Sequence, residues 1–521
     1  MAKWLGSVDP DQGCLLPVDV RSWLPPDHLA FQVAGVVGQL DLAGFEAAYR
    51  ADRQGQAPYD PAMMVGLLFY CYFKGIRSSR KIAAACIDDL GCRVICGGAA
   101  PSHQAVAAFI RRHGPEIRRL FVQVLCLLAA EGAVAGYSAA VDGSPVSGNA
   151  SRFANLTGEQ LADRIAAVQA ALDAEARAWL DGAAADPQLP LRDDDDDERD
   201  DDDERDEEDL PPGGGVPRRL AGLAAKLARL RAAQAKLAGR QAAGGAAARI
   251  DAAQDAAQAA ARRLAAAEAA QAAKVAKYQA AVAAGKPWRY GKIPLPAEAS
   301  KKVARLRTRA QNAAARLAAA RAAAAASPVK VSATDPDSRL VPAKNGGGWT
   351  QGWNLQLAAA RRQILLSAEL HDNPADAGAL VQMIHATAAN CELAGLAAQI
   401  RAWLADSGYA SAAAFKELDH LMLLVAVRNE AAQAGRGDGR TAVPPGWEKM
   451  AARLTTPAGK RLYARRAAQV EPAFAQFFAR FGRHVNYRGR DAVDTEIKLL
   501  ATVHNLAKLL DHRRRHPVPA T

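Results

Sequence analysis

The chain has 521 residues, of which 50% are hydrophobic, and a formal net charge of +11 at neutral pH. This length and composition predict two to four domains with buried cores and exclude a chain that is disordered throughout. No apolar run reaches the roughly 18 residues of a membrane-spanning helix, and the N-terminal MAKWLGSVDP lacks the apolar core of a signal peptide. We therefore expect a cytoplasmic protein.

The net charge combines two segments of opposite sign. Residues 193–209 hold 15 acidic residues and two arginines, a charge of −13, whereas residues 216–330 carry a charge of +19. The acidic segment repels itself and cannot bury anything, so it is expected to be a disordered tether. Clustered basic residues gain affinity for polyanions by releasing counterions from phosphates. The basic segment indicates nucleic acid or an anionic membrane as partner, although a solvated basic face would explain most of its charges.

Seven cysteines are scattered along the chain, an odd number that favours reduced thiols over a disulfide framework. One possible set of zinc ligands is Cys92, Cys96 and His103. Their spacing is poor and no fourth ligand lies nearby in the sequence. Buried or unreactive thiols are the favoured interpretation.

Residues 1–135 are predicted to form a helical N-terminal domain that binds DNA. Apolar residues recur at helical spacing in Leu40–Tyr49, Pro61–Phe73, Lys81–Leu90 and Ser102–Ala130. Asp60 before Pro61 is a typical helix start. Basic residues fall on the predicted connections: Arg77, Arg80, Lys81, Arg111 and Arg112. A helical domain that only packs on its neighbour is the alternative.

A strand-like run, YSAAVDGSPV, follows and is broken by its Asp-Gly pair; we assign residues 136–155 to this first strand. Residues 156–330 are predicted to be an insertion. It begins with a helix, continues through the acidic tether and ends in an Ala-rich segment, residues 217–326. Leucines at three- and four-residue steps before and after GKPWRYGKIPLP predict that this segment forms a basic antiparallel coiled-coil hairpin.

Residues 331–511 alternate between strand and helix patterns. Predicted strands are Trp353–Ala360, Gln363–Leu370, Ile400–Ala405 and Leu421–Arg428, and predicted helices run from Asn373-Pro374 to Leu393 and over Ala412–Leu418, Leu462–Phe481 and Asp494–Leu510. This order is typical of a mixed α/β sheet. Residues 512–521 are expected to be a basic flexible tail.

Three acids stand where such a sheet would gather them. Asp142 is expected to end the first strand, Asp406 ends a later strand, and Glu471 lies on the helix after the last strand. A site that breaks or joins phosphodiesters needs hard oxygen ligands for Mg²⁺. Each acid alone is weak evidence, because an Asp before Gly is usually a turn residue.

Several blocks of sequence, in order along the chain, resemble the DDE-type insertion-sequence transposases of the IS-four-like group. They are LDLAGFEAAYRADRQGQAPYDPAMMVGLLFYCYFKGIRSSRKIAAAC, PSHQAVAAFIRRH, VDGSPVSGNAS, TDPDSRLV, GWNLQLAAA, NPADAGAL, ADSGYAS, YARRAAQVEPAFAQFFARFG and EIKLLATVHNLAKLL. The resemblance implies an α/β fold: an RNase H-like mixed-sheet core, a helical N-terminal domain, and a long helical coiled-coil insertion between the first and second core strands. It covers nearly all the chain outside residues 156–330.

The resemblance also implies roles for individual residues. Asp142, Asp406 and Glu471 match the catalytic triad that holds two Mg²⁺ ions, with Mn²⁺ as a substitute. Tyr463 and Arg466 match the family's tyrosine and arginine and would contact DNA phosphates.

Three positions depart from the family pattern. Phe478 stands where the family often has Lys, Ala475 where it often has Gly, and Pro145 where it often has Lys near the first Asp. Arg480 is the candidate substitute for the missing cation and the third predicted DNA-binding residue.

The predicted function is that of a transposase. It binds the terminal inverted repeats of its insertion sequence and catalyses metal-dependent cleavage and strand transfer on double-stranded DNA, as a homodimer or larger assembly. The resemblance also implies a bacterial-type cytoplasmic protein that associates with the nucleoid and has no membrane partner. The alternative is a catalytically impaired, transposase-derived regulatory protein that binds DNA. A cytoskeletal or RNA-binding coiled-coil protein would explain residues 217–326 but not the three acid blocks.

Overall fold

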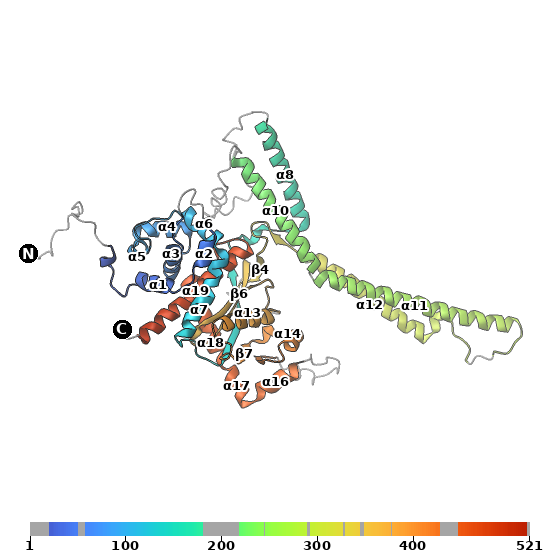
Figure 1. Ribbon diagram of the computed structural model, residues 1–521. Coiled ribbons are helices and arrows are strands. Elements are labelled where there is room, and N and C mark those ends of the chain that lie inside the picture. The colour runs from blue at the N-terminus through green and yellow to red at the C-terminus, as the bar shows by residue number, and fades with distance from the viewer. Residues whose placement is uncertain are drawn as a thin grey trace, which may run out of the picture. The chain divides into compact units, whose positions relative to one another are not determined.

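The computed structural model describes residues 20–49, 58–180, 218–243, 245–288, 292–326, 329–343, 348–376, 378–427 and 446–517 (Figure 1). The chain divides into two compact units. The first is formed by residues 1–152 with 337–521, and the second by residues 153–336. The acidic segment 193–209, predicted to be a tether, lies outside the described residues.

The first unit begins with short helices. Their bounds are η1 Val20–Trp23, α1 Leu29–Val37, α2 Ala43–Ala47, α3 Pro61–Phe73, α4 Ser79–Asp88, α5 Leu90–Ile95, α6 His103–Arg112 and α7 Gly114–Ala130. The helix predicted over Pro61–Phe73 is confirmed as α3. Asp60 caps it, because its carboxylate accepts a 3.1 Å hydrogen bond from the backbone N–H of Ala62. Residues 64–72 of α3 are all buried, and the helix packs against α1, α4 and α5.

Several cysteines lie in this helical core as free thiols. Cys71, Cys86, Cys92 and Cys96 are buried. The Cys71 and Cys92 sulfurs are 3.6 Å apart. These thiols therefore pack against one another among the apolar side chains of the core.

One mixed sheet forms the centre of the first unit. Its strands are β1 Ser138–Ser147, β4 Arg339–Pro342, β5 Trp349–Ala359, β6 Leu365–His371, β7 Ala402–Ala405 and β8 Met422–Val425. β5 pairs along one edge with β1 and along the other with β4 and β6, and all of these pairs are antiparallel. β1 is parallel to β7, which is parallel to β8. The carboxyl ends of β1, β7 and β8 therefore lie at the same edge of the sheet.

Helices follow the strands of this sheet. Their bounds are η4 Arg361–Gln363, α13 Ala379–Leu393, η5 Ser407–Tyr409, α14 Ala412–Glu417, α16 Trp447–Thr455, α17 Pro457–Tyr463, α18 Arg465–Phe481 and α19 Arg490–Arg515. α18 packs on β1 and β5, and α19 packs on α7 and β6. The helices before β1 and the sheet share one continuous hydrophobic core.

A buried ion pair links the N-terminal helices to the last helix. Arg77 lies 2.7 Å from Glu496 of α19, and both side chains are almost fully buried. Arg77 also donates to the carbonyl oxygens of Phe481 and His484. Arg77 does lie on a connection between helices, as predicted, but it is not available to DNA there, because its guanidinium is held inside the protein.

Two local predictions for the first unit are also corrected. β1 is not broken at its Asp-Gly pair, because Asp142 and Gly143 pair with Leu357 and Gln356 of β5. Asp142 therefore lies inside the strand and does not end it. The expected flexible tail over residues 512–521 begins too early, since α19 continues to Arg515 and Arg513 forms a 2.6 Å ion pair with Glu131.

The second unit is built mainly from long helices. They are α8 Gly158–Leu180, α10 Arg218–Ala243, α11 Gly245–Ala283 and α12 Lys301–Ala326, with η2 Arg152–Ala154 before them and η3 Ala297–Ala299 before α12. The short strands β2 Asn155–Leu156 and β3 Val331–Ser332 pair in antiparallel fashion. Figure 1 shows α8 beside α10 and α12 beside α11.

These helices form two antiparallel pairs. Arg231 of α10 bonds to Gln169 of α8, and Glu268 of α11 lies 2.7 Å from Arg307 of α12. The prediction of a single hairpin over residues 217–326 is therefore wrong for α10, because this helix pairs with α8, which lies outside that segment. The leucines of α10 pack on Leu161 and Val168 of α8, which present a matching apolar stripe. No helix in the described part of the chain is long and apolar enough to cross a membrane.

Candidate active site

Asp142 lies on the face of β1 that α18 covers. Its carboxylate accepts a 2.9 Å hydrogen bond from the backbone N–H of Gly143. Burial raises the pKa of Asp142, and the negative charges of Asp406 and Asp376 raise it further, while the Gly143 N–H and Arg466 lower it. Asp142 is thus a carboxylate with little access to water and with other acids close by.

Asp406 stands next to Asp142 because of the strand register. Ala140 of β1 pairs with Leu404 of β7, and each acid lies two residues after its member of that pair, Asp142 within β1 and Asp406 directly after the end of β7. Side chains two residues apart share a face, and neighbouring strands lie about 4.8 Å apart. Asp406 also caps η5, accepting a 2.8 Å hydrogen bond from Gly408 N–H. The parallel pairing of β1 and β7 therefore brings together two acids that are 264 residues apart in the sequence.

Glu471 joins these acids through an arginine. Arg466, in the first turn of α18, has one guanidinium nitrogen 3.4 Å from Asp142 and the other 3.6 Å from Glu471. The side chain of Arg466 is only 16% exposed, whereas that of Glu471 is 59% exposed. Arg466 lies five residues before Glu471, and its long side chain spans the gap that helical spacing leaves. Arg466 is thus a mostly buried cation that contacts two of the three predicted acids.

Tyr463 completes the group from the end of α17. Burial is the largest influence on the pKa of Tyr463 and raises it. The hydrogen bond of this side chain with Arg466 and the charges of Asp406 and Asp142 affect the same pKa to a smaller extent. Ala464 separates α17 from α18, so Tyr463 and Glu471 lie on two helices, where one was predicted. The structure nevertheless brings Tyr463, Arg466 and the acids together.

A fourth acid, Asp376, lies in the same site and was not predicted. Its carboxylate accepts hydrogen bonds from the side-chain amides of Asn354, at 3.1 Å, and Gln356, at 2.7 Å. The hydroxyl of Tyr409 donates to the Gln356 side-chain oxygen. Asn354 and Gln356 are polar residues that alternate with Trp353, Leu355 and Leu357 in the buried part of β5. That alternation was the available signal, because buried amides need partners.

Arg480 lies apart from this group. Its guanidinium stacks on the Phe73 ring, 4.3 Å from the centroid, and burial lowers its pKa. Arg483 lies closer to Asp142. It covers the Phe478 ring at 3.9 Å and donates a 3.1 Å hydrogen bond to the hydroxyl of Ser144, two residues after Asp142 on β1. Arg483 was missed because Gly482, at φ +74°, turns the chain back toward the sheet after α18.

The acids of this site offer oxygen ligands to a divalent cation. Carboxylate oxygens are the ligands that Mg²⁺ prefers, and a cation would relieve the repulsion between Asp142, Asp406 and Asp376. Within the described ranges, no three acidic, histidine or cysteine side chains are placed closely enough to hold a metal ion. Asp142 and Asp406 fit such an ion by chemistry and position, whereas Glu471 can join them only when Arg466 moves aside.

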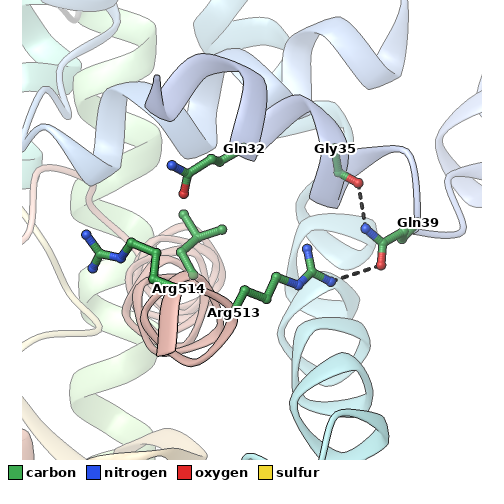
Figure 2. Close-up of a pocket in the computed structure, with 6 residues that line it drawn as sticks. Gln32, Gly35, Gln39, Arg513 and Arg514 are labelled. Atoms are coloured by element: carbon green, nitrogen blue, oxygen red, sulfur yellow. Dashed lines mark hydrogen bonds between the residues drawn. The ribbon is translucent and has the colours of Figure 1, made fainter. Parts of the chain in front are cut away.

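A separate cavity of about 300 Å³ lies between α1 and α19 (Figure 2). Gln39 accepts a 3.0 Å hydrogen bond from Arg513 and donates a 2.7 Å hydrogen bond to the Gly35 carbonyl. Arg513 is also paired with Glu131. Because these polar groups already bond to one another, the cavity offers no reactive group.

Comparison with protein families gives two matches. Residues 18–112 match the family described as "Transposase domain (DUF772)", and residues 444–510 match the family described as "Transposase DDE domain". No curated protein and no solved structure matches the chain. Both matched segments are thus similar to transposase families. The two matches together support its assignment to the DDE-type insertion-sequence transposases.

The matched segments contain some of the predicted site residues and not others. Tyr463, Arg466, Glu471 and Arg480 lie inside the matched segment 444–510. Asp142 and Asp406 lie outside both segments, so their assignment depends on the sheet geometry described above.

Proposed function

We propose that this transposase binds the terminal inverted repeats of its insertion sequence, cleaves the DNA at each end and transfers the strands to target DNA. The observation that carries the proposal is the placement of Asp142 on β1 and of Asp406 directly after the adjacent parallel strand β7, with Glu471 tied to Asp142 through Arg466. The strand order β4-β5-β1-β7-β8, with β6 also paired to β5 and with β5 antiparallel to each strand that it pairs with, supports an RNase H-like core.

Asp142, Asp406 and Glu471 would hold two Mg²⁺ ions, or Mn²⁺ in their place. Such ions, when bound, polarise the scissile phosphate and lower the pKa of the attacking water or 3′-hydroxyl. Asp142 is suited to this role because burial and two neighbouring carboxylates make an added positive charge favourable there.

The other residues of the site would position DNA. In the free protein Arg466 neutralises Asp142 and Glu471, and it can turn its planar guanidinium onto a DNA phosphate when those acids take a metal. Tyr463 can donate a hydrogen bond to the same backbone. Arg483, and not Arg480, supplies a cation beside Phe478, where the family often has Lys, because it lies over that ring and contacts β1 next to Asp142.

The second unit offers a separate basic surface. α12 carries seven basic and no acidic residues. We assign to α11 and α12 the role of contacting DNA outside the cleavage site through phosphates, a contact that depends on salt and not on sequence. Two protomers are required to pair two DNA ends, so the active form is a homodimer or larger assembly.

The experiment uses the full chain and a labelled duplex made from the DNA that flanks its reading frame. Asp142→Asn, Asp406→Asn and Glu471→Gln are each expected to abolish cleavage in Mg²⁺ while binding of the duplex stays near the unmutated level. Asp419→Asn removes an exposed carboxylate of the first unit and serves as the control. Cleavage by a triad variant at the unmutated rate would overturn the site. If the unmutated chain binds the duplex but never cleaves it, the impaired, regulatory alternative holds.

A further inference from the structure

A basic cavity of about 640 Å³ lies on the first unit, near the start of β1. The start of β1, η4, the first turns of α18 and the end of α19 surround it. Its charged lining consists of Arg361, Arg362, Arg465, Lys508 and Arg515, with Asp511 as the acid. The cavity therefore carries a strong excess of positive charge.

The acid in the lining does not neutralise this charge. Asp511 already lies 2.6 Å from Arg515 and 3.4 Å from Arg514. Arg361, Arg362 and Arg465 are exposed, and among the described residues no acid lies within 4 Å of their guanidinium groups. Three cations thus face the solvent at the mouth of the cavity without a protein anion beside them.

Lys508 shows the same excess from inside the cavity. Burial lowers its pKa, and the positive charges of Arg515 and Arg480 lower it further, against the opposing effect of Asp511. Its ammonium donates a 2.6 Å hydrogen bond to the neutral side chain of Gln476. A bound anion would stabilise the charged form of this lysine.

The turn that carries two of the arginines is held in an unusual conformation. Arg362 and Gln363 have φ values of +63° and +59°, in the left-handed region that residues other than glycine avoid. The buried side chain of His504 bonds to the Gln363 carbonyl at 2.8 Å, and Asn505 bonds to both the N–H and the carbonyl of Leu365. α19 therefore fixes this strained turn, and strain of this kind concentrates at functional sites.

One turn of α18 joins the cavity to the acids. Arg466 contacts Asp142, whereas Arg465 and Gln469 line the cavity. Gln469 donates a 3.0 Å hydrogen bond to the hydroxyl of Ser138, which lines the cavity at the start of β1. Ser138 and Asp142 are four residues apart on one strand, or roughly 13 Å. In a DNA strand this length corresponds to about four nucleotide steps.

We propose that this basic cavity binds the sugar-phosphate backbone of the DNA strand whose scissile bond lies at the acid site, and so fixes the position of the cut along that strand. The inference rests on the proposed function of the acid site. Phosphate oxygens match the forked donors of Arg361, Arg362 and Arg465, and backbone contacts set register without reading sequence.

The test measures binding of the full chain to the flanking duplex by fluorescence anisotropy at several salt concentrations. Arg361→Gln, Arg362→Gly and Arg465→Gln each remove one charge, and glycine at 362 suits the positive φ, so that variant keeps the turn. Each change is expected to reduce the slope of log affinity against log salt by about 0.9. Arg362→Lys is expected to restore most of that slope. Arg119→Gln removes an exposed charge on α7 and is the matched control.

Cleavage mapping provides the second readout. A variant that combines Arg361→Gln, Arg362→Gly and Arg465→Gln is expected to cut at several neighbouring positions at low salt. The acids remain in this triple variant, but the backbone contact that would fix the position of the cut is lost. If the triple variant keeps both the salt slope and the single cut, the cavity does not bind the backbone. If the unmutated chain binds but does not cut, the proposed function of the acid site fails, while the salt slopes still decide whether the cavity binds DNA.

Discussion

The guanidinium of Arg466 lies 3.4 Å from the carboxylate of Asp142, on the side that faces α18. The same guanidinium lies 3.6 Å from Glu471. Arg466 therefore occupies the space between two acids that a divalent cation would need, and it competes with that cation for their charge.

This relationship predicts the effect of Arg466→Gln. Affinity for Mn²⁺ in the absence of DNA should rise several-fold, because a competing positive charge of this kind is worth about 1 kcal/mol or more at a half-buried site. Cleavage should fall about 100-fold, because a phosphate contact is lost. Mn²⁺ titration followed by electron paramagnetic resonance checks the first effect. Arg461→Gln, on exposed α17 surface, should change neither quantity; weaker Mn²⁺ binding by the Arg466 variant would contradict the competition.

Removal of the Asp376 charge should lower the metal affinity, the opposite of the effect expected for Arg466→Gln. The negative charge of Asp376 is close enough to raise the pKa of Asp142, so Asp376→Asn should weaken Mn²⁺ binding several-fold. The asparagine oxygen can still accept the amide hydrogens of Asn354 and Gln356. Asp376→Leu cannot accept them and should lower the free energy of unfolding by about 1–3 kcal/mol more than the Asn variant. Equal stability of the two variants, measured by urea unfolding, would show that the amide network is unimportant.

Asp142 and Asp406 could be predicted to lie near each other because Asp142 lies in a buried strand and Asp406 directly follows one, and both strand patterns are visible in the sequence. Asp376 could not be placed, because NPADAGAL indicates a helix start and gives no sign that its acid faces β5. The ion pair of Arg77 with Glu496 spans 419 residues, so the sequence around Arg77 showed only a basic connection. The pairing of α10 with α8 could not be predicted either, since apolar stripes on helices can pair in more than one way. In addition, the acidic segment separates α8 from α10 in the sequence.

Gly143 allows the acids to approach each other. A Cβ atom on this residue would lie 2.1 Å from a carboxylate oxygen of Asp376 and 2.3 Å from the Gln356 amide nitrogen. Gly143→Ala should therefore displace both side chains, cost about 1–3 kcal/mol of stability and reduce cleavage at least tenfold. Gly148→Ala, whose Cβ would meet its nearest atoms at 3.5 Å, is the control and should be tolerated. Thermal unfolding and a cleavage assay test both variants, and full activity in Gly143→Ala would show that the site is not tightly packed.

The pair Arg77–Glu496 should contribute to stability and not to DNA binding. Removing one partner leaves the other charge buried, so Glu496→Gln should lower the free energy of unfolding by about 3–5 kcal/mol. Glu496 also accepts a 2.8 Å hydrogen bond from the backbone N–H of Asn486, which the amide replaces poorly. Arg119→Gln removes a 70% exposed arginine and should change stability by less than about 0.5 kcal/mol. A loss of stability for Glu496→Gln no larger than that of the control would exclude the linking role.

His504 should make the stability of the first unit sensitive to acid. Its side chain is fully buried, and burial lowers its pKa from 6.5 to about 4. Since the folded pKa lies below the unfolded one, the unfolded chain takes up a proton first as the pH falls, and stability is lost between about pH 6.5 and pH 4. The full effect of this one group is about 3 kcal/mol. The stability of His504→Gln and of the unmutated chain is compared by urea unfolding at pH 7 and pH 5. The variant should lose less stability between these two pH values. This holds even if it is less stable at pH 7 because its bond to the Gln363 carbonyl is altered. An equal loss in both proteins would mean that His504 is protonated in the folded state, and that the turn carrying Arg361 and Arg362 is held by a charged histidine.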